Sequence, residues 1–151
     1  MLTAKDVMTK DVVTTTRLTT VRELAEIFAS RKISSVPVVD NAGMLVGIVT
    51  ETDLIEQDRN LHIPTVVSIF DWVLYLESDK KFERELKKMT GQVVGDIYSQ
   101  KVDTVTPATP VSEVADLLAS RKINAVPVVE DGKVVGIVAR IDLIRTMIGN
   151  R

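Results

Sequence analysis

Cysteine is absent from the 151-residue chain, and histidine occurs once, at His62. Disulfides, thiolate nucleophiles and cysteine-ligated metals are therefore excluded. A single histidine also leaves little for a metal site or a histidine-based catalytic triad. We expect no catalytic residue, no metal site and no required cofactor.

Net charge is small as well, with a formal value of −2. It gives no general attraction for nucleic acid or an anionic membrane, and no basic, aromatic-bearing face is evident. The first residues, Met1 to Asp6, lack the apolar core of a signal peptide. The most apolar stretch, Ile63 to Leu76, is too short to span a bilayer. These absences lead us to expect a cytoplasmic protein that binds neither nucleic acid nor membrane.

An internal repeat is the strongest feature that is present. Residues 6–40 align with 96–130 without a gap, and 17 of the 35 pairs are identical. Residues 43–55 then match 132–144, with eight of 13 identical. Two copies are too few for a solenoid and favour a closed pseudo-twofold pair.

Each copy has the pattern β-α-β-β-α, which predicts an α/β protein. Val12-Val13-Thr14 is a short β-prone run. A helix follows, with apolar residues at Val21, Leu24, Ala25 and Phe28 and a capping box formed by Thr20 and Glu23. In the second copy Pro110 is expected as the first helical residue, one position away from the first copy's start.

Two strands and a short helix complete each copy. The strands are expected over 36–39 and 45–50, and in the second copy Asp131-Gly132 is a hairpin-turn signal. Pro37 and Pro127 cannot donate to a sheet, so an edge or a bulge is expected there. The last helix begins near Thr52 and, in the second copy, near Ile141.

The repeats divide the chain into a first repeat (2–57), a helical insertion (58–91) and a second repeat (92–148). Within the insertion, a helix over 63–76 is apolar nearly all round, and a second helix begins near Ser78 and ends at Gly91. An all-apolar helix needs two burial partners, so we expect a homodimer.

The segment from Gly47 to Asp53 is the sharpest local pattern. A strand ends at Thr50 and a helix follows directly, so its backbone amides attract an anion. A carboxylate three residues after Thr50 is placed to accept both hydroxyls of a ribose. Gly47 allows a ligand or another backbone to approach closely. The alternative is that Asp53 only caps the helix.

The Val-Pro-Val-Val strand, the glycine-containing strand and the trailing Asp-Leu-Ile helix occur twice in the same order. In this arrangement the sequence resembles a pair of cystathionine β-synthase-type (CBS) domains, a Bateman module. The resemblance covers roughly residues 2–57 and 92–148. It implies a disc-like pair with two clefts that hold AMP, ADP, ATP, S-adenosylmethionine or related adenosyl compounds.

The resemblance also implies that each cleft combines residues of both copies. One would contain Thr50, Thr52, Asp53, Val102, Asp103, Ile123, Asn124 and Ala125. The other would contain Val12, Val13, Ile33, Ser34, Ser35, Ala139, Arg140 and Asp142. Ala139 replaces the usual hydroxyl, so the Asp53 cleft is expected to bind a phosphorylated ligand more tightly. The lack of basic residues before either Val-Pro strand favours a monophosphate or an uncharged adenosyl group.

The sequence therefore predicts a regulatory module that binds an adenine nucleotide or S-adenosylmethionine without catalysis. An enzyme is disfavoured, because no nucleophile–base pair or glycine-rich phosphate loop is present. The remaining alternative is an interaction scaffold with unoccupied clefts that docks a partner protein through the inserted helices.

Overall fold

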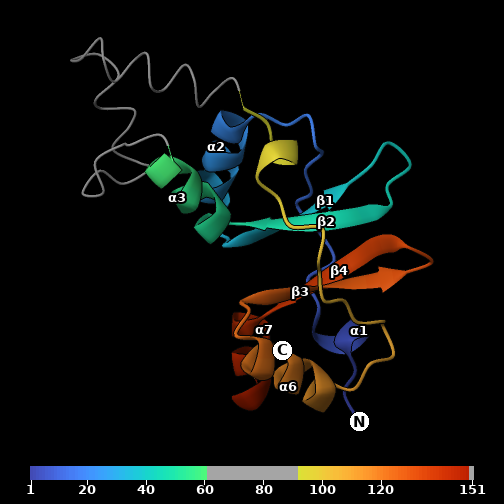
Figure 1. Cartoon of the computed structure of the whole chain (residues 1–151). Helices are drawn as coiled ribbons and strands as arrows, with labels where there is room; N and C mark the ends of the chain where they lie inside the picture. Colours follow the sequence, from blue (N-terminus) through green and yellow to red (C-terminus); the bar gives the residue numbers. More distant parts are fainter. Residues whose placement is uncertain (61–91, 150–151) are drawn as a thin grey trace.

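The computed structural model describes residues 1–60 and 92–149, and the two helices expected in the insertion lie outside them. Two antiparallel hairpins lie next to each other at the centre, with the longer helices on their outer sides (Figure 1). The two-repeat α/β fold expected from the sequence is confirmed. The elements are α1 (Ala4–Val7), α2 (Val21–Arg31), β1 (Ser35–Val39), β2 (Leu45–Thr50), α3 (Glu51–Asn60), a 3-10 turn η2 (Val94–Asp96), α6 (Val111–Arg121), β3 (Ala125–Glu130), β4 (Lys133–Ala139) and α7 (Arg140–Met147).

The long helices begin at equivalent positions in the two repeats. The Thr20 hydroxyl accepts the Glu23 amide at 3.1 Å and caps α2, as predicted. Pro110 precedes α6 in the equivalent capping position, so the prediction that it is the first helical residue was wrong. Its ring fixes the extended entry to the helix without supplying a side-chain cap. The final helices begin at Glu51 and Arg140, one residue before the predicted positions.

The strand expected at Val12-Val13-Thr14 is reduced to a single bridge residue, Thr15. Its amide donates to the Pro37 carbonyl at 3.0 Å, and its carbonyl accepts from the Val39 amide at 2.8 Å. The next bond of this parallel ladder would run from the amide of residue 37 to the Val13 carbonyl. Proline has no amide hydrogen, so the pairing stops there.

The hairpins carry the predicted irregularities. In β1 the register with β2 shifts between Val38 and Val39, one residue beyond Pro37, and β3 shifts at the equivalent place. Asp131 and Gly132 have φ values of 54° and 82°. Positive φ at both central residues is what a two-residue type I′ turn requires.

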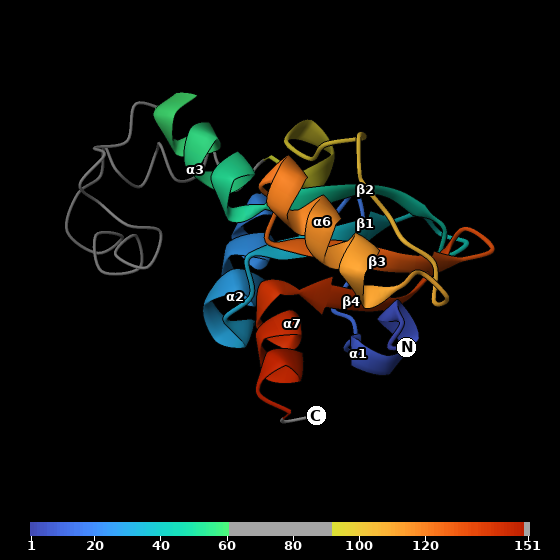
Figure 2. The same cartoon turned by 90° about the horizontal axis from the view of Figure 1, so that it is seen from below.

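The first segment of each repeat packs on the other repeat. The Ala4 amide donates to the Thr109 carbonyl at 2.8 Å, and α1 lies beside α6 and α7 (Figure 2). Conversely, the Val94 amide donates to the Thr19 carbonyl at 2.8 Å. Ala4 joins the second repeat's apolar cluster, and Val94 joins the first repeat's. The two cores are therefore completed by exchanged segments.

Glycines at equivalent places in β2 and β4 make this exchange possible. A Cβ at Gly47 would meet the Ser99 carbonyl and the Tyr98 ring, and one at Gly136 would meet the Met8 side chain. The close approach predicted at Gly47 is thus made by another backbone. Ser99 and Ile48 form two hydrogen bonds there, each at 2.9 Å.

Across residues 1–60 and 92–149, every helix is too short or too polar to cross a bilayer.

Candidate functional site

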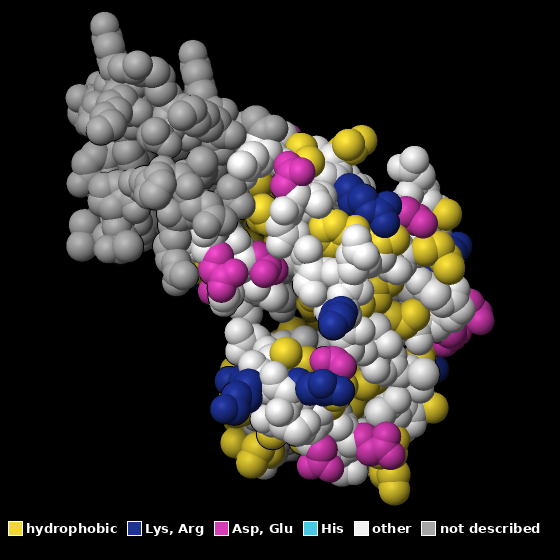
Figure 3. Space-filling model, in the orientation of Figure 1, with side chains coloured by type: hydrophobic (Ala, Val, Ile, Leu, Met, Phe, Trp, Pro, Cys, Tyr) yellow, Lys and Arg dark blue, Asp and Glu magenta, His cyan; other side chains and the backbone are white. Residues whose placement is uncertain are grey.

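A cavity of about 440 Å³ lies between the two repeats. In Figure 3 the surface is indented on the left, where the half that carries α3 meets the half that carries α7. Both repeats line the cavity, so its shape depends on how they are held together. Its lining residues are Thr9, Asp11, Val12, Val13, Lys32, Ile33, Ser34, Ser35, Glu51, Asn124, Ala125, Ile137, Ala139, Arg140, Ile141, Asp142 and Arg145.

All eight residues expected in one of the two clefts line this cavity, from Val12 to Asp142. Sequence reasoning missed Lys32 and Glu51, although each directly adjoins a predicted residue or segment. It also missed Thr9 and Ile137, which pair across the two repeats. The Thr9 amide donates to the Ile137 carbonyl at 2.9 Å, and the Ile137 amide donates to the Thr9 carbonyl at 3.0 Å. No local signal in the sequence indicates that long-range pairing.

The cavity contains one buried carboxylate, that of Asp142, which is 7% exposed. Its Oδ2 atom accepts the Ala139 amide at 2.8 Å and so holds the start of α7. Its Oδ1 atom lies 3.9 Å from Nη1 of Arg145. One oxygen therefore caps the helix, while the other has only a long ion pair with an exposed arginine side chain.

Pro37 leaves one backbone carbonyl, that of a cavity-lining residue, without its ladder partner. In the described part of the chain, the Val13 carbonyl accepts no backbone hydrogen bond. A backbone carbonyl without a hydrogen bond, in a residue that lines the cavity, is a candidate acceptor for a ligand's donor group. Val12 and Val13 also contribute apolar side chains to the same lining.

Charge in the cavity lining is formally balanced, with three basic and three acidic side chains. They are Lys32, Arg140, Arg145, Asp11, Glu51 and Asp142. The Arg140 side chain is partly engaged, because its Nε atom donates to the Ile123 carbonyl at 3.1 Å. Among the described residues, no group of three or more histidine or acidic side chains is placed to hold a metal ion.

In the other expected cleft, the polar side chains of Thr50 and Asp53 are already hydrogen-bonded to each other. Oδ2 of Asp53 accepts the Thr50 amide at 2.9 Å and the Thr50 hydroxyl at 3.2 Å. The hydroxyl proton is thus already donated, and it would have to leave Asp53 to reach a phosphate. Thr52 is exposed on α3.

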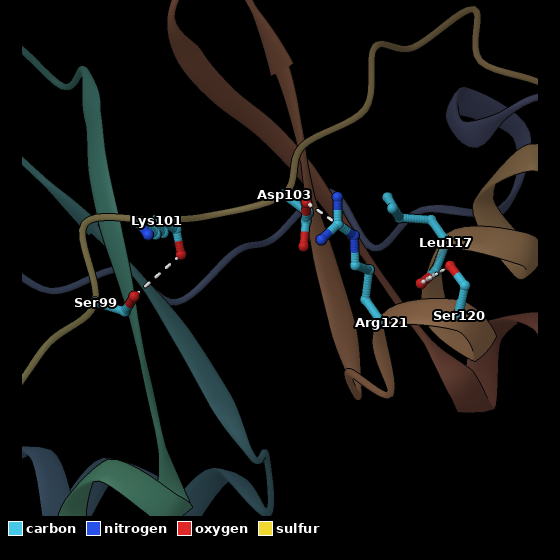
Figure 4. A network of polar contacts seen from close by, with 6 residues as sticks. All are labelled: Ser99, Lys101, Asp103, Leu117, Ser120 and Arg121. Atoms are coloured by element: carbon cyan, nitrogen blue, oxygen red, sulfur yellow. Dashed lines mark hydrogen bonds and ion pairs between the residues drawn. The ribbon is translucent and has the colours of Figure 1, made fainter.

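Asp103, expected in the same cleft, faces the C-terminal end of α6 (Figure 4). Its Oδ1 atom lies 3.8 Å from Nε of Arg121, and its neighbour Val102 is half-buried. The Ile123 carbonyl is occupied by Arg140. Asn124 and Ala125 line the cavity described above, so two residues of this predicted set lie with the other set.

A duplicated α/β unit with a cavity between its copies places the chain in the class of tandem-repeat α/β proteins. The family model for the CBS domain matches this chain twice, over residues 4–60 and 94–149. The chain belongs to the CBS-domain family.

Similar proteins come from distant organisms. An uncharacterized protein of Methanocaldococcus jannaschii is 31% identical over 134 residues, which cover 83% of this chain and 80% of the relative. The chloroplastic CBS domain-containing protein CBSX2 of Arabidopsis thaliana is 32% identical over 137 residues. That match covers 84% of this chain but only 55% of the relative.

Two solved structures of CBS domain pairs contain adenosyl compounds. CBSX2 in complex with AMP has a TM-score of 0.75 and 27% identity, covering 99% of this chain and 98% of that one. A pair in complex with 5′-methylthioadenosine and S-adenosyl-L-methionine has a TM-score of 0.73 and 26% identity, covering 100% and 99%. Relatives of this chain therefore bind adenosyl ligands.

Proposed function

We propose that this chain is a regulatory module that binds an adenosyl ligand in the cavity between its repeats and catalyses no reaction. The observation that carries the proposal is the cavity itself, which combines apolar side chains, one unpaired backbone carbonyl and one buried carboxylate. AMP and S-adenosylmethionine complexes of similar domain pairs support the ligand class.

Each part of an adenosyl ligand has a counterpart in the lining. Val12, Val13 and Ile33 offer an apolar surface to a flat base, and the Val13 carbonyl offers an acceptor to its edge. Oδ1 of Asp142 offers a charged acceptor to ribose hydroxyls, which form stronger hydrogen bonds with a carboxylate than with neutral groups.

The charge balance favours a ligand with at most one phosphate. Three cations are offset by three carboxylates, so the lining has no net attraction for a triphosphate. Arg140 begins α7, and the guanidinium of Arg145, from the last turn, lies 3.9 Å from the Asp142 carboxylate in the first turn. A single phosphate at that helix start would have both of them and the helix dipole within reach.

Ligand binding is proposed to act by tightening the contact between repeats. Val13 and Asp142 come from different repeats, and a ligand held by both stabilises their joint arrangement. A partner protein that senses this arrangement would then respond to ligand concentration.

A thermal-shift panel of adenosine, AMP, ATP, GTP and S-adenosylmethionine tests the proposal. A ligand at about one hundred times its Kd raises the free energy of unfolding by about 2.7 kcal/mol. We expect AMP or an uncharged adenosyl compound to raise the melting temperature more than ATP or GTP. If no adenosyl compound does so at millimolar concentration, the scaffold alternative takes precedence.

We also propose a homodimer. The 63–76 segment that first indicated one lies outside the described residues, but α7 independently exposes apolar side chains. Ile144 is 51% exposed on that helix, and Ile148, directly after its last residue, is 70% exposed. Apolar surface of this kind is commonly covered by a second copy. Light scattering at tens of micromolar should give about twice 16.7 kDa, and a monomer mass would contradict the dimer.

A further inference from the structure

Ser35 begins β1 and faces away from the first repeat's core. Side chains alternate along a strand, and the neighbouring Val36 and Val38 belong to the apolar core cluster. Ser35 therefore lies on the opposite face of β1, where it lines the cavity between the repeats.

The Ser35 hydroxyl is buried without a hydrogen bond. The residue is 6% exposed, and its Oγ atom has no partner among the described residues. Most buried hydroxyls in proteins are hydrogen-bonded, so an exception beside a cavity needs a reason. The Oγ atom is itself buried, so it reaches the cavity only by turning about χ1. No bond holds it, and it can therefore turn among its three staggered positions without breaking one.

The second repeat has no such hydroxyl. Ala125 occupies the equivalent position at the start of β3 and is also buried at the cavity. The polar group is thus a property of one repeat, and the duplicated fold alone does not require it.

We infer that the Ser35 hydroxyl hydrogen-bonds the ligand's heterocyclic base and is a specificity-determining residue of the cavity. The inference rests on the proposed adenosyl binding. The base is the part assigned to Ser35 because the apolar lining residues Val12, Val13 and Ile33 come from the same repeat. A hydroxyl both donates and accepts, so it matches either a ring nitrogen or an exocyclic amine.

Ser35→Ala removes this hydroxyl and little else. We expect affinity for AMP to fall roughly twofold to tenfold, the range for one neutral hydrogen bond. The fall should be equal for adenosine, because the bond is made to the base that both ligands share. The melting temperature without ligand should stay the same or rise, because the lost hydroxyl has no partner.

Thr15→Val is the matched control. Thr15 is 5% exposed, and its hydroxyl is likewise buried without a partner among the described residues. It does not line the cavity, and valine has the same shape. This substitution should therefore leave the affinity for both ligands unchanged.

Calorimetric titration of adenosine and AMP into the three proteins gives distinct outcomes. Wild-type affinity in Ser35→Ala overturns the role of Ser35 while the proposed function stands. A loss confined to AMP, or an equal loss in Thr15→Val, also overturns it. If the wild-type protein binds neither ligand, the proposed function fails and this inference fails with it.

Discussion

The carboxylate of Asp142 holds the amide of Ala139 at 2.8 Å, and this bond fixes the first turn of α7 beside the cavity. Asp53 holds the Thr50 amide at 2.9 Å in the same geometry at the start of α3. The two aspartates therefore share one structural role, but only Asp142 lines the described cavity. They form a matched pair for separating helix capping from ligand binding.

Asp142→Asn should weaken AMP binding about fivefold. The asparagine oxygen can still accept the Ala139 amide, so the helix start survives. Ribose hydroxyls would lose a charged acceptor, and a hydrogen bond to a charged group is worth roughly 1 kcal/mol more than a neutral one. Calorimetric titration measures the change. Asp53→Asn should leave this site within about twofold of wild type, and equal losses in both variants would contradict the assignment.

Gly47→Ala should destabilise the protein more than Gly136→Ala. A methyl group at Gly47 meets the Ser99 carbonyl, and backbone cannot move without breaking the Ile48–Ser99 hydrogen bonds. At Gly136 it meets the flexible side chain of Met8, which can turn away. We expect losses of about 2–3 and about 1 kcal/mol respectively. Urea unfolding checks the order, and a reversed order would show that the Ser99 contact is not tight.

Val94→Ala should destabilise the first repeat, although Val94 belongs to the second repeat in sequence. Its side chain is fully buried in the cluster of Val21, Leu24 and Val49. Removal of two buried methyl groups should lower the free energy of unfolding by about 2 kcal/mol.

Leu18→Ala is the control for this prediction, because Leu18 is 82% exposed and should contribute little. Urea unfolding should be followed by two signals, the circular dichroism of the helices and the binding of AMP. Both signals should be lost in the same transition. Two separate transitions would show that the exchanged segments do not couple the repeats.

Much of the fold could be predicted because its elements are indicated by neighbouring residues in the sequence. The stripe of Val21, Leu24 and Phe28 indicates a helix face, and Asp131-Gly132 indicates a turn, from neighbouring residues alone. The pairing of Thr9 with Ile137 could not be predicted, because it joins segments far apart in sequence.

The candidate site residues were predicted through the family resemblance rather than through local chemistry, and their role stays a prediction. Asp53 and Asp142 have the same sequence pattern, and only the structure distinguishes their surroundings. The sequence favoured the Asp53 cleft because Thr50 has a hydroxyl, but that hydroxyl already donates to Asp53 at 3.2 Å. This bond argues against the expected affinity advantage, which remains a prediction. Sequence reasoning also named Ser35 without indicating that its hydroxyl is unpartnered.

The exchange of leading segments determines how such a protein can be assembled. A polypeptide with one repeat alone would leave the place of Val94 empty and would need a second chain to fill it. Such a pair would dissociate on dilution. With two copies joined in one chain, the exchange becomes intramolecular, and its completion no longer depends on protein concentration. The cavity between the repeats is therefore completed within a single chain, whatever the protein concentration.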